Sequence, residues 1–144
     1  MVFQLSQKSL ARLIGIHPDL VRVVKLGLTM SPHDFAVSEG LRSLERQREL
    51  VAKGASMTLK SKHLRQIDGW AHAVDLVAVG DLDHDGDVDA QDVGLVWEPK
   101  VYTDIAVAMK RAAVESGVRV RWGGEFKARD GRPWFDGPHW EIVL

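Results

Sequence analysis

AHAVDLVAV, residues Ala71–Val79, is the stretch that decides the fold we expect. It is almost continuously apolar and rich in valine, which is typical of a strand buried at the centre of a sheet. One acid, Asp75, interrupts the run. We therefore predict a central strand that carries a single carboxylate.

The segments on either side of this strand alternate between helical and extended patterns. Glycines that follow two of the helical segments are typical stop signals. The order of elements predicts an α+β fold, in which one domain spanning residues 1–144 has a small antiparallel sheet with flanking helices. The predicted helices are Ser6–Leu13, Pro18–Met30, Ser43–Lys53 and Lys100–Ser116, and the other strands are Phe35–Ser38, Val118–Trp122 and Trp140–Leu144.

Composition excludes several classes of function. The net charge is -1, and no dense run of lysine and arginine occurs, so nucleic acid is not an expected partner. The chain has no cysteine, so any metal must be held by histidine, aspartate or glutamate. No apolar run approaches the roughly 18 residues of a membrane span, and the N-terminus lacks the pattern of a secretory signal. We expect a monomer with no membrane insertion that accumulates in the cytoplasm.

A set of histidines and acids fits a catalytic zinc site. Such a site takes three protein ligands, drawn from imidazoles and a carboxylate, and keeps a fourth position open for water. His63, Asp75 and His139 supply that set, and Asp75 would place the zinc on the sheet. Asp136 lies three residues before His139 in a Gly-Pro turn, which makes it the candidate general base.

These residues stand in a recognisable order along the chain. A Ser-x-His segment at 61–63 comes first, a glycine- and alanine-containing segment ending in Asp75 follows, and an acid three residues before His139 comes last. The pattern resembles the VanY-like family of D-alanyl-D-alanine carboxypeptidases and L-alanyl-D-glutamate endopeptidases, which includes many phage endolysins. The resemblance spans nearly the whole chain. It implies that His63, Asp75 and His139 bind zinc and that Asp136 takes the proton from the attacking water.

The same resemblance suggests roles for further residues. Arg42, in a Gly-x-Arg segment, would hold the polarised carbonyl oxygen. Ser61 and Gln47 match family positions near the substrate. Independently of the resemblance, Glu141 is a candidate to orient a metal ligand through a hydrogen bond. Three tryptophans near the late motif fit either a cleft wall or the core: Trp122, Trp134 and Trp140.

One departure from the family pattern makes His72 an alternative ligand. The gap between His63 and Asp75 is longer than is usual in the family, and residues 65–68 look like an insertion. In a strand, however, residues an odd number apart face opposite sides, so His72 and Asp75 cannot readily reach one metal. Helix capping or plain exposure explains His17 and His33, which lie beside prolines.

The acidic stretch DLDHDGDVDAQD, residues 81–92, follows the twelve-residue calcium loop. Carboxylates fall at loop positions 1, 3, 5, 9 and 12, position 7 offers its carbonyl, and Gly86 makes the bend. The stretch resembles the EF-hand-like loops of dockerins, and aspartate at position 12 would weaken bidentate binding. We predict that calcium binds this inserted loop and orders the strand that carries Asp75. The predicted ligands are Asp81, Asp83, Asp85, Asp87, Asp89 and Asp92.

Together these patterns predict a zinc peptidase that cuts the peptide stems of bacterial peptidoglycan. A compact chain without a signal is typical of a phage endolysin, which waits in the host cytoplasm until another protein opens the membrane. Its expected target is the L-alanyl-D-glutamate bond. The alternatives are a D-alanyl-D-alanine carboxypeptidase and, in a different class, a non-catalytic calcium-dependent binding module.

Overall fold

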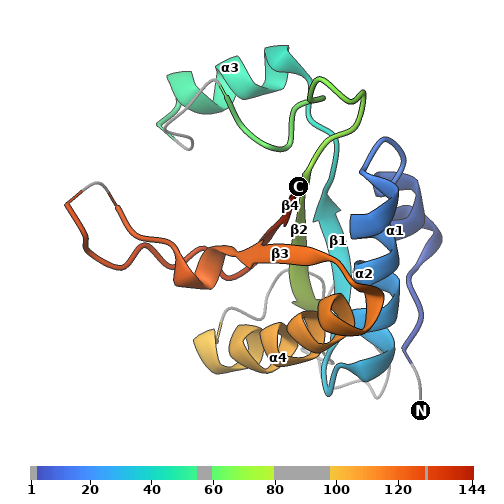
Figure 1. Ribbon diagram of the computed structural model, residues 1–144. Helices are drawn as coiled ribbons and strands as arrows, with labels where there is room; N and C mark the ends of the chain where they lie inside the picture. Colours follow the sequence, from blue (N-terminus) through green and yellow to red (C-terminus); the bar gives the residue numbers. More distant parts are fainter. Residues whose placement is uncertain (1–2, 55–59, 80–97, 129) are drawn as a thin grey trace, which may run out of the picture.

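A four-stranded antiparallel sheet forms the centre of the molecule (Figure 1). The computed structural model describes residues 3–54, 60–79, 98–128 and 130–144. In these residues the strands pair in the order β1-β2-β4-β3, so β2 is internal, as its apolar run predicts. The strands are β1 (Asp34–Glu39), β2 (Ala73–Val79), β3 (Arg119–Trp122) and β4 (His139–Val143).

Helices accompany this sheet, which confirms the α+β fold. They are α1 (Gln7–Arg12), α2 (Pro18–Met30), α3 (Leu44–Ala52) and α4 (Pro99–Ser116), and a 3-10 turn, η1 (Gly123–Glu125), follows β3. None of the described helices combines the length and apolarity needed to cross a membrane.

The central strand begins two residues later than its apolar run predicts. The backbone of Ala71 bonds to the turn between α1 and α2: its N–H donates to Gly15 O at 2.9 Å, and its carbonyl accepts from His17 N at 2.9 Å. Because these groups are already satisfied by that turn, regular pairing in the sheet starts only at Ala73.

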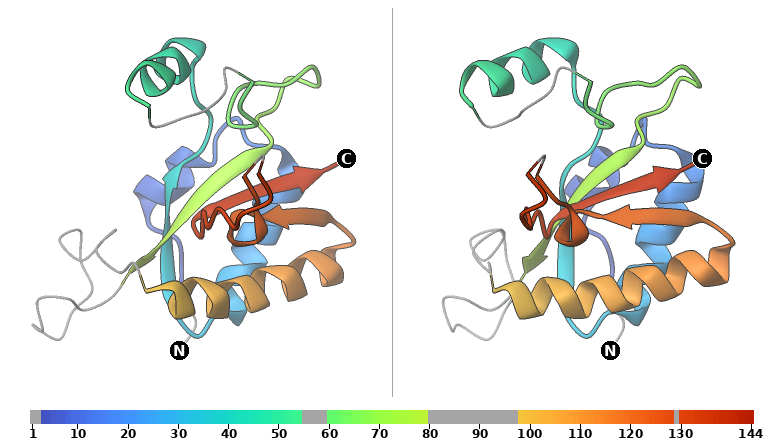
Figure 2. Two further views of the ribbon diagram at one scale, coloured as in Figure 1. Left: turned by 90° about the vertical axis from the view of Figure 1, so that its left-hand side faces the viewer. Right: turned by 60° about the vertical axis from the view of Figure 1, so that its left-hand side comes forward.

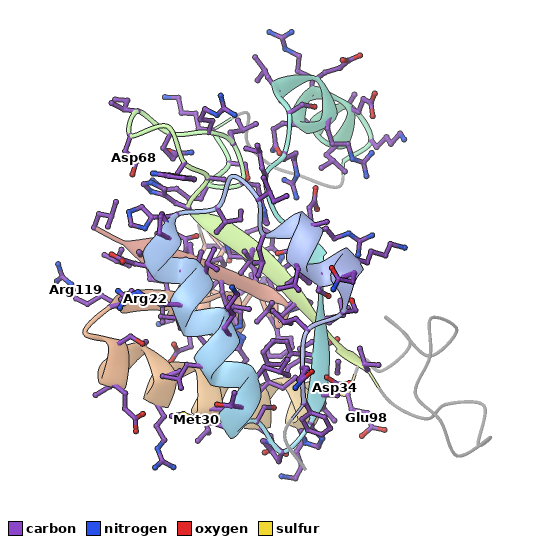
Figure 3. The ribbon with its side chains drawn as sticks, turned by 90° about the vertical axis from the view of Figure 1, so that its right-hand side faces the viewer. Arg22, Met30, Asp34, Asp68, Glu98 and Arg119 are labelled. Atoms are coloured by element: carbon purple, nitrogen blue, oxygen red, sulfur yellow. The ribbon has the colours of Figure 1, made fainter. Side chains whose placement is uncertain are left out.

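One face of the sheet packs on the helices and holds the core. Val74, Leu76 and Ala78 alternate along β2, and all three belong to the buried core cluster. Trp140 and Ile142 of β4 join them. Figure 3 shows α2 lying across this face. The helix turns a stripe with helical spacing toward the sheet, made of Leu20, Val23, Val24 and Leu28.

A glycine lets α2 and α4 approach closely. A Cβ atom added at Gly27 would lie 2.5 Å from the sulfur of Met109, far inside contact distance. Met109 is itself fully buried in the middle of α4. The absence of a side chain at Gly27 therefore sets how tightly the two helices pack.

The opposite face of the sheet is left for the site. Figure 2 shows the connection between β3 and β4, described for residues 123–128 and 130–138, in front of β2 and β4 in its left-hand view, with α3 above. We call this connection the arm. Its two sides are joined by a bridge between Lys127 and Pro133. The face between α3 and the arm displays the residues of β2 and β4 that alternate with the core positions.

Candidate metal centre

The register of the sheet brings two of the expected ligands together. Asp75 of β2 pairs directly with His139 of β4, and both side chains project on the face opposite the one that packs on α2. His63 reaches the same point from the loop before β2. Its Nε2 lies 3.2 Å from Asp75 Oδ1, and His139 Nδ1 lies 3.3 Å from that same oxygen. The three ligand atoms lie within 4.8 Å of one another.

The ring of His63 is fixed by a backbone carbonyl. His63 is 2% exposed, and its Nδ1 lies 3.0 Å from Gly40 O. A carbonyl only accepts hydrogen bonds, so Nδ1 carries the proton and donates it. The backbone N–H of Arg42 donates to His63 O at 2.8 Å, which ties the two loops together. In the neutral ring, Nε2 therefore presents its lone pair to Asp75.

The ring of His139 is fixed in the same way by a carboxylate. Its Nε2 lies 3.0 Å from Glu141 Oε1, two residues along the same strand and therefore on the same face. An ionised carboxylate only accepts, so Nε2 carries the proton and Nδ1 turns its lone pair toward Asp75. This carboxylate–histidine pairing is the usual orienting device of histidine metal ligands. Glu141 thus contacts the ring of a candidate ligand and fixes its orientation.

Two imidazole lone pairs and a carboxylate oxygen consequently converge on one point. Such an arrangement is repulsive unless a cation lies among them, either a metal ion or a proton. Zinc bonds of about 2.0–2.1 Å in tetrahedral geometry would set ligand atoms about 3.3–3.4 Å apart. The distances from Asp75 to His63 and His139, 3.2 and 3.3 Å, fit that spacing.

The pKa values show how strongly this point attracts positive charge. Burial alone would raise the pKa of Asp75, but the hydrogen bonds and positive charge that His139 and His63 supply when their rings are protonated hold it well below its usual range. Burial would likewise lower the pKa of His139. The hydrogen bonds to Asp75 and Glu141 outweigh burial and raise the pKa of His139 to about 9. Without metal, a proton takes the place that a metal ion would fill.

Asp136 lies at the edge of this centre in a firmly held turn. Its backbone N–H donates to Gly123 O at 2.9 Å, and the indole N–H of Trp122 donates to Gly137 O at 2.8 Å. Gly123 has no room for a side chain, since a Cβ there would lie 2.2 Å from Asp136 O. Burial and the charge of Asp75 raise the pKa of Asp136 above its ordinary value, which suits a proton acceptor.

Arg42 is held on the other side of the centre by a set of acceptors. Its guanidinium forms a two-point ion pair with Glu39, at 2.6 and 2.7 Å, and donates from Nη1 to Gln47 Oε1 at 2.6 Å. A longer contact of 3.4 Å joins Nη1 to Ser61 Oγ. Gln47 is 0% exposed and supports Arg42 from the interior, and its contact with substrate stays a prediction. Ser61 lines the cleft.

A cleft of about 520 Å³ opens over these groups. Leu50 of α3 lines it on one side, Phe126 and Trp134 of the arm on another, and Arg121 and Glu141 of the sheet between them. A cleft of this size and lining can take a short peptide.

Comparisons with known proteins identify the family. A family model described as phage L-alanyl-D-glutamate peptidase matches residues 1–143. The chain belongs to this family. It is 26% identical to the L-alanyl-D-glutamate peptidase of Escherichia phage T5 over 149 residues, covering 99% of this chain and all of the relative. The crystal structure of the Serratia marcescens L-Ala D-Glu endopeptidase ChiX matches with a TM-score of 0.75 and 45% identity, covering 97% of this chain and 90% of that one.

The tryptophans of this family member divide between core and cleft. Trp122 and Trp140 are buried and stack on each other, with ring centroids 6.0 Å apart. Trp134 is half exposed and lines the cleft beside Phe126. The sequence left both interpretations open because a tryptophan near a site suits either environment.

Three further histidines of this peptidase lie in the described residues, and all three are away from the centre. His72 Nε2 lies 2.7 Å from Asp68 Oδ2, so its side chain faces away from Asp75, as strand periodicity predicts. His17 caps α2, its Nδ1 accepting from Asp19 N at 3.1 Å. His33 lies 2.9 Å from Asp104.

Several residues that shape the centre escaped the sequence argument. Glu39 binds Arg42. In the sequence, this ion pair is indicated only by the spacing of the two residues, an acid three positions before an arginine. The Gly40 carbonyl and the close approach at Gly123 carry no signal at all, because backbone groups and missing side chains are visible only in three dimensions. Phe126 was missed as well; its ring centroid lies 5.4 Å from that of His139.

The acidic stretch of the peptidase, residues 81–92, lies outside the described residues. The family and the relatives found by comparison carry names that concern peptidase activity alone. Calcium binding at Asp81, Asp83, Asp85, Asp87, Asp89 and Asp92 therefore stays a prediction from ligand spacing.

Proposed function

We propose that this chain is a zinc-dependent endopeptidase that hydrolyses the L-alanyl-D-glutamate bond in the stem peptides of bacterial peptidoglycan. The observation that carries the proposal is the convergence of two oriented imidazole lone pairs on the Asp75 carboxylate. Membership of the phage L-alanyl-D-glutamate peptidase family supports the choice of bond. The names of the two relatives, a peptidase and an endopeptidase for the same bond, support it as well.

His63, Asp75 and His139 would hold the zinc, which supplies a Lewis acid that polarises the carbonyl and lowers the pKa of water toward neutrality. Asp136 accepts the proton as the water oxygen attacks the carbonyl carbon. It then delivers that proton to the amide nitrogen as the carbon–nitrogen bond breaks. The raised pKa of Asp136 favours the first step, because it makes this carboxylate a stronger base than an ordinary aspartate.

Arg42 stabilises the negative charge that develops on the carbonyl oxygen. Glu39 accepts from Nε and from one N–H of Nη2, and Gln47 accepts from one N–H of Nη1. These bonds orient the guanidinium before substrate binds. Within the described residues, a second Nη2 N–H is left to donate to the substrate. A preorganised donor of this kind is typically worth a factor of about 10²–10³ in rate.

A pair of histidine variants tests the proposal. His139→Ala should lose bound zinc and abolish lysis of purified cell walls while the fold remains. His72→Ala is the matched control, since it removes the same side chain outside the centre and should keep both properties. Metal analysis by mass spectrometry and a turbidity assay give the two readouts. Hydrolysis by His139→Ala, or activity in protein that contains no zinc, would contradict the proposal.

The bond itself is tested by mass spectrometry of digested muropeptides. Cleavage between L-alanine and D-glutamate releases the part of the stem that begins with D-glutamate, whereas a D-alanyl-D-alanine carboxypeptidase removes only the terminal residue. Release of D-alanine alone would favour the carboxypeptidase alternative.

We further propose that residues 81–92 bind calcium and that calcium strengthens activity. The support is the spacing of the carboxylates together with the position of β2, which carries Asp75 and ends at Val79, just before this stretch. Chelation of calcium with zinc retained should lower both hydrolysis and the melting temperature. If neither the hydrolysis rate nor the melting temperature changed, calcium regulation would be refuted. In a separate metal analysis, calcium without zinc in the purified protein would favour the binding-module alternative.

We also propose that the enzyme acts as a monomer from the host cytoplasm, reaching the wall after the membrane is permeabilised. Support comes from the family, whose printed description names phage. Expression in a bacterium should leave the culture intact until a membrane-permeabilising agent is added, and size-exclusion chromatography should give a mass near 16.0 kDa. Lysis without the agent would contradict action from the cytoplasm. A dimer on the column would contradict the monomeric state.

A further inference from the structure

Two cations of the cleft lie beside a single carboxylate next to the metal centre. Arg121 pairs with Glu141 across β3 and β4, and its Nη1 lies 3.6 Å from Glu141 Oε2. The charge of Lys62, the residue before His63, also acts on Glu141 and favours its ionised form. Both cations line the cleft.

The positive charge here exceeds what Glu141 can balance. This carboxylate already accepts from His139 through Oε1, and only Oε2 faces Arg121. On the far side of the centre the balance is different, because the charge of Arg42 is balanced by Glu39 at 2.6 and 2.7 Å. The cleft therefore has an excess of positive charge on the side of Lys62 and Arg121.

The guanidinium of Arg121 is both positioned and accessible. It lies over the ring of Phe126, 5.1 Å from the centroid, which holds it against the base of the arm. Its side chain is 61% exposed, whereas that of Glu141 is 10% exposed. A ligand in the cleft thus meets the cation before the carboxylate beneath it. Lys62 is likewise exposed.

The substrate proposed above carries an anion in the matching place. In an L-alanyl-D-glutamate bond, glutamate contributes its nitrogen to the bond that is cut. Only one of its two carboxyl groups continues the chain, so the other is left ionised. The carboxyl group on the glutamate Cα is three bonds from the scissile carbonyl carbon, which is at most about 4 Å away. A lysine or arginine side chain at the rim of the metal centre can span the remaining distance.

We propose that Lys62 and Arg121 bind the free carboxylate of the glutamate residue on the leaving side of the scissile bond. The inference rests on the proposed function, and it names the two side chains that would make the enzyme select a substrate with this carboxylate. It also fixes the direction of the substrate, since the glutamate side must then lie over β3 and β4 and the alanine side toward Arg42.

Two synthetic stem peptides test this, identical except that one has the free glutamate carboxylate and the other a primary amide there. The wild type should cleave the carboxylate peptide with a kcat/KM about tenfold higher or more, as charge-assisted hydrogen bonds imply. The double variant Lys62→Met, Arg121→Met should lose that preference through a raised KM for the carboxylate peptide. Its activity on the amide peptide and its zinc content should change little.

Lys60→Met is the matched control, because it removes one lysine charge from another place in the same cleft. It should keep the preference, and Arg121→Lys should keep most of it. The inference would be overturned if the double variant lost the same fraction of kcat/KM on both peptides. It would also be overturned if Lys60→Met lost the preference for the carboxylate peptide as completely as the double variant. A wild type that cleaves both peptides equally would overturn it too. A wild type that cleaves neither would instead overturn the proposed function, and this inference with it.

Discussion

Zinc uptake at the centre of His63, Asp75 and His139 should depend steeply on pH, because in the metal-free chain a proton occupies the nitrogen that zinc needs. The pKa of His139 rises from 6.5 to about 9, which corresponds to about 3 kcal/mol in favour of the charged ring. Below pH 9, zinc must displace that proton. The apparent zinc affinity should therefore fall about tenfold for each pH unit below 9 and level off above it.

Competition with a chromophoric zinc chelator, at constant ionic strength between pH 7 and 10, measures this dependence. Glu141→Gln supplies the matched variant, since the amide oxygen still accepts from His139 Nε2 but carries no charge. The pKa of His139 should then fall, and the affinity should level off at a lower pH. The loss of the orienting charge should also weaken zinc binding at high pH by about 10–100-fold. A wild-type affinity that is flat between pH 7 and 9 would refute the reasoning.

Three further predictions concern catalysis, packing and stability. Asp136→Asn should lower kcat by about 10²–10⁴-fold with zinc content unchanged, and near-normal turnover would exclude Asp136 as the general base. Gly27→Ala should cost about 1–3 kcal/mol, seen as a lower urea midpoint, because its methyl group would meet Met109; an unchanged midpoint would show that α2 and α4 adjust freely. The metal-free protein should lose up to about 3 kcal/mol of stability as the pH rises from 6.5 through about 9, because folding favours protonated His139 and that gain disappears when the ring deprotonates. Urea unfolding with a chelator present measures this, and constant stability over that range would contradict it.

Local patterns in the sequence were sufficient to predict the elements of the fold. The apolar run at Ala71–Val79 became the internal strand β2, and helical spacing predicted α2 and α4 to within a residue. Strand periodicity also separated His72 from Asp75 correctly. These predictions succeed because periodicity and capping involve residues that are neighbours in the chain.

Roles within the site were harder to predict. The family position of Gln47 suggests a place near the substrate, and the structure adds that its side chain is buried and accepts a hydrogen bond from Arg42. A family position indicates that a residue matters to the site. It does not say whether the residue touches substrate or supports a neighbour that does.

The sequence by itself determined which groups could form a metal centre: with no cysteine, only histidines and acids remain, and their order along the chain indicates the family. The tertiary structure alone decided how they act. Asp75 and His139 are 64 residues apart and meet only through the register of β2 and β4. The Gly40 carbonyl and Glu141 then fix which nitrogen of each ring carries the proton. The physical reason is that register and tautomer depend on hydrogen bonds between distant segments, which no local pattern encodes.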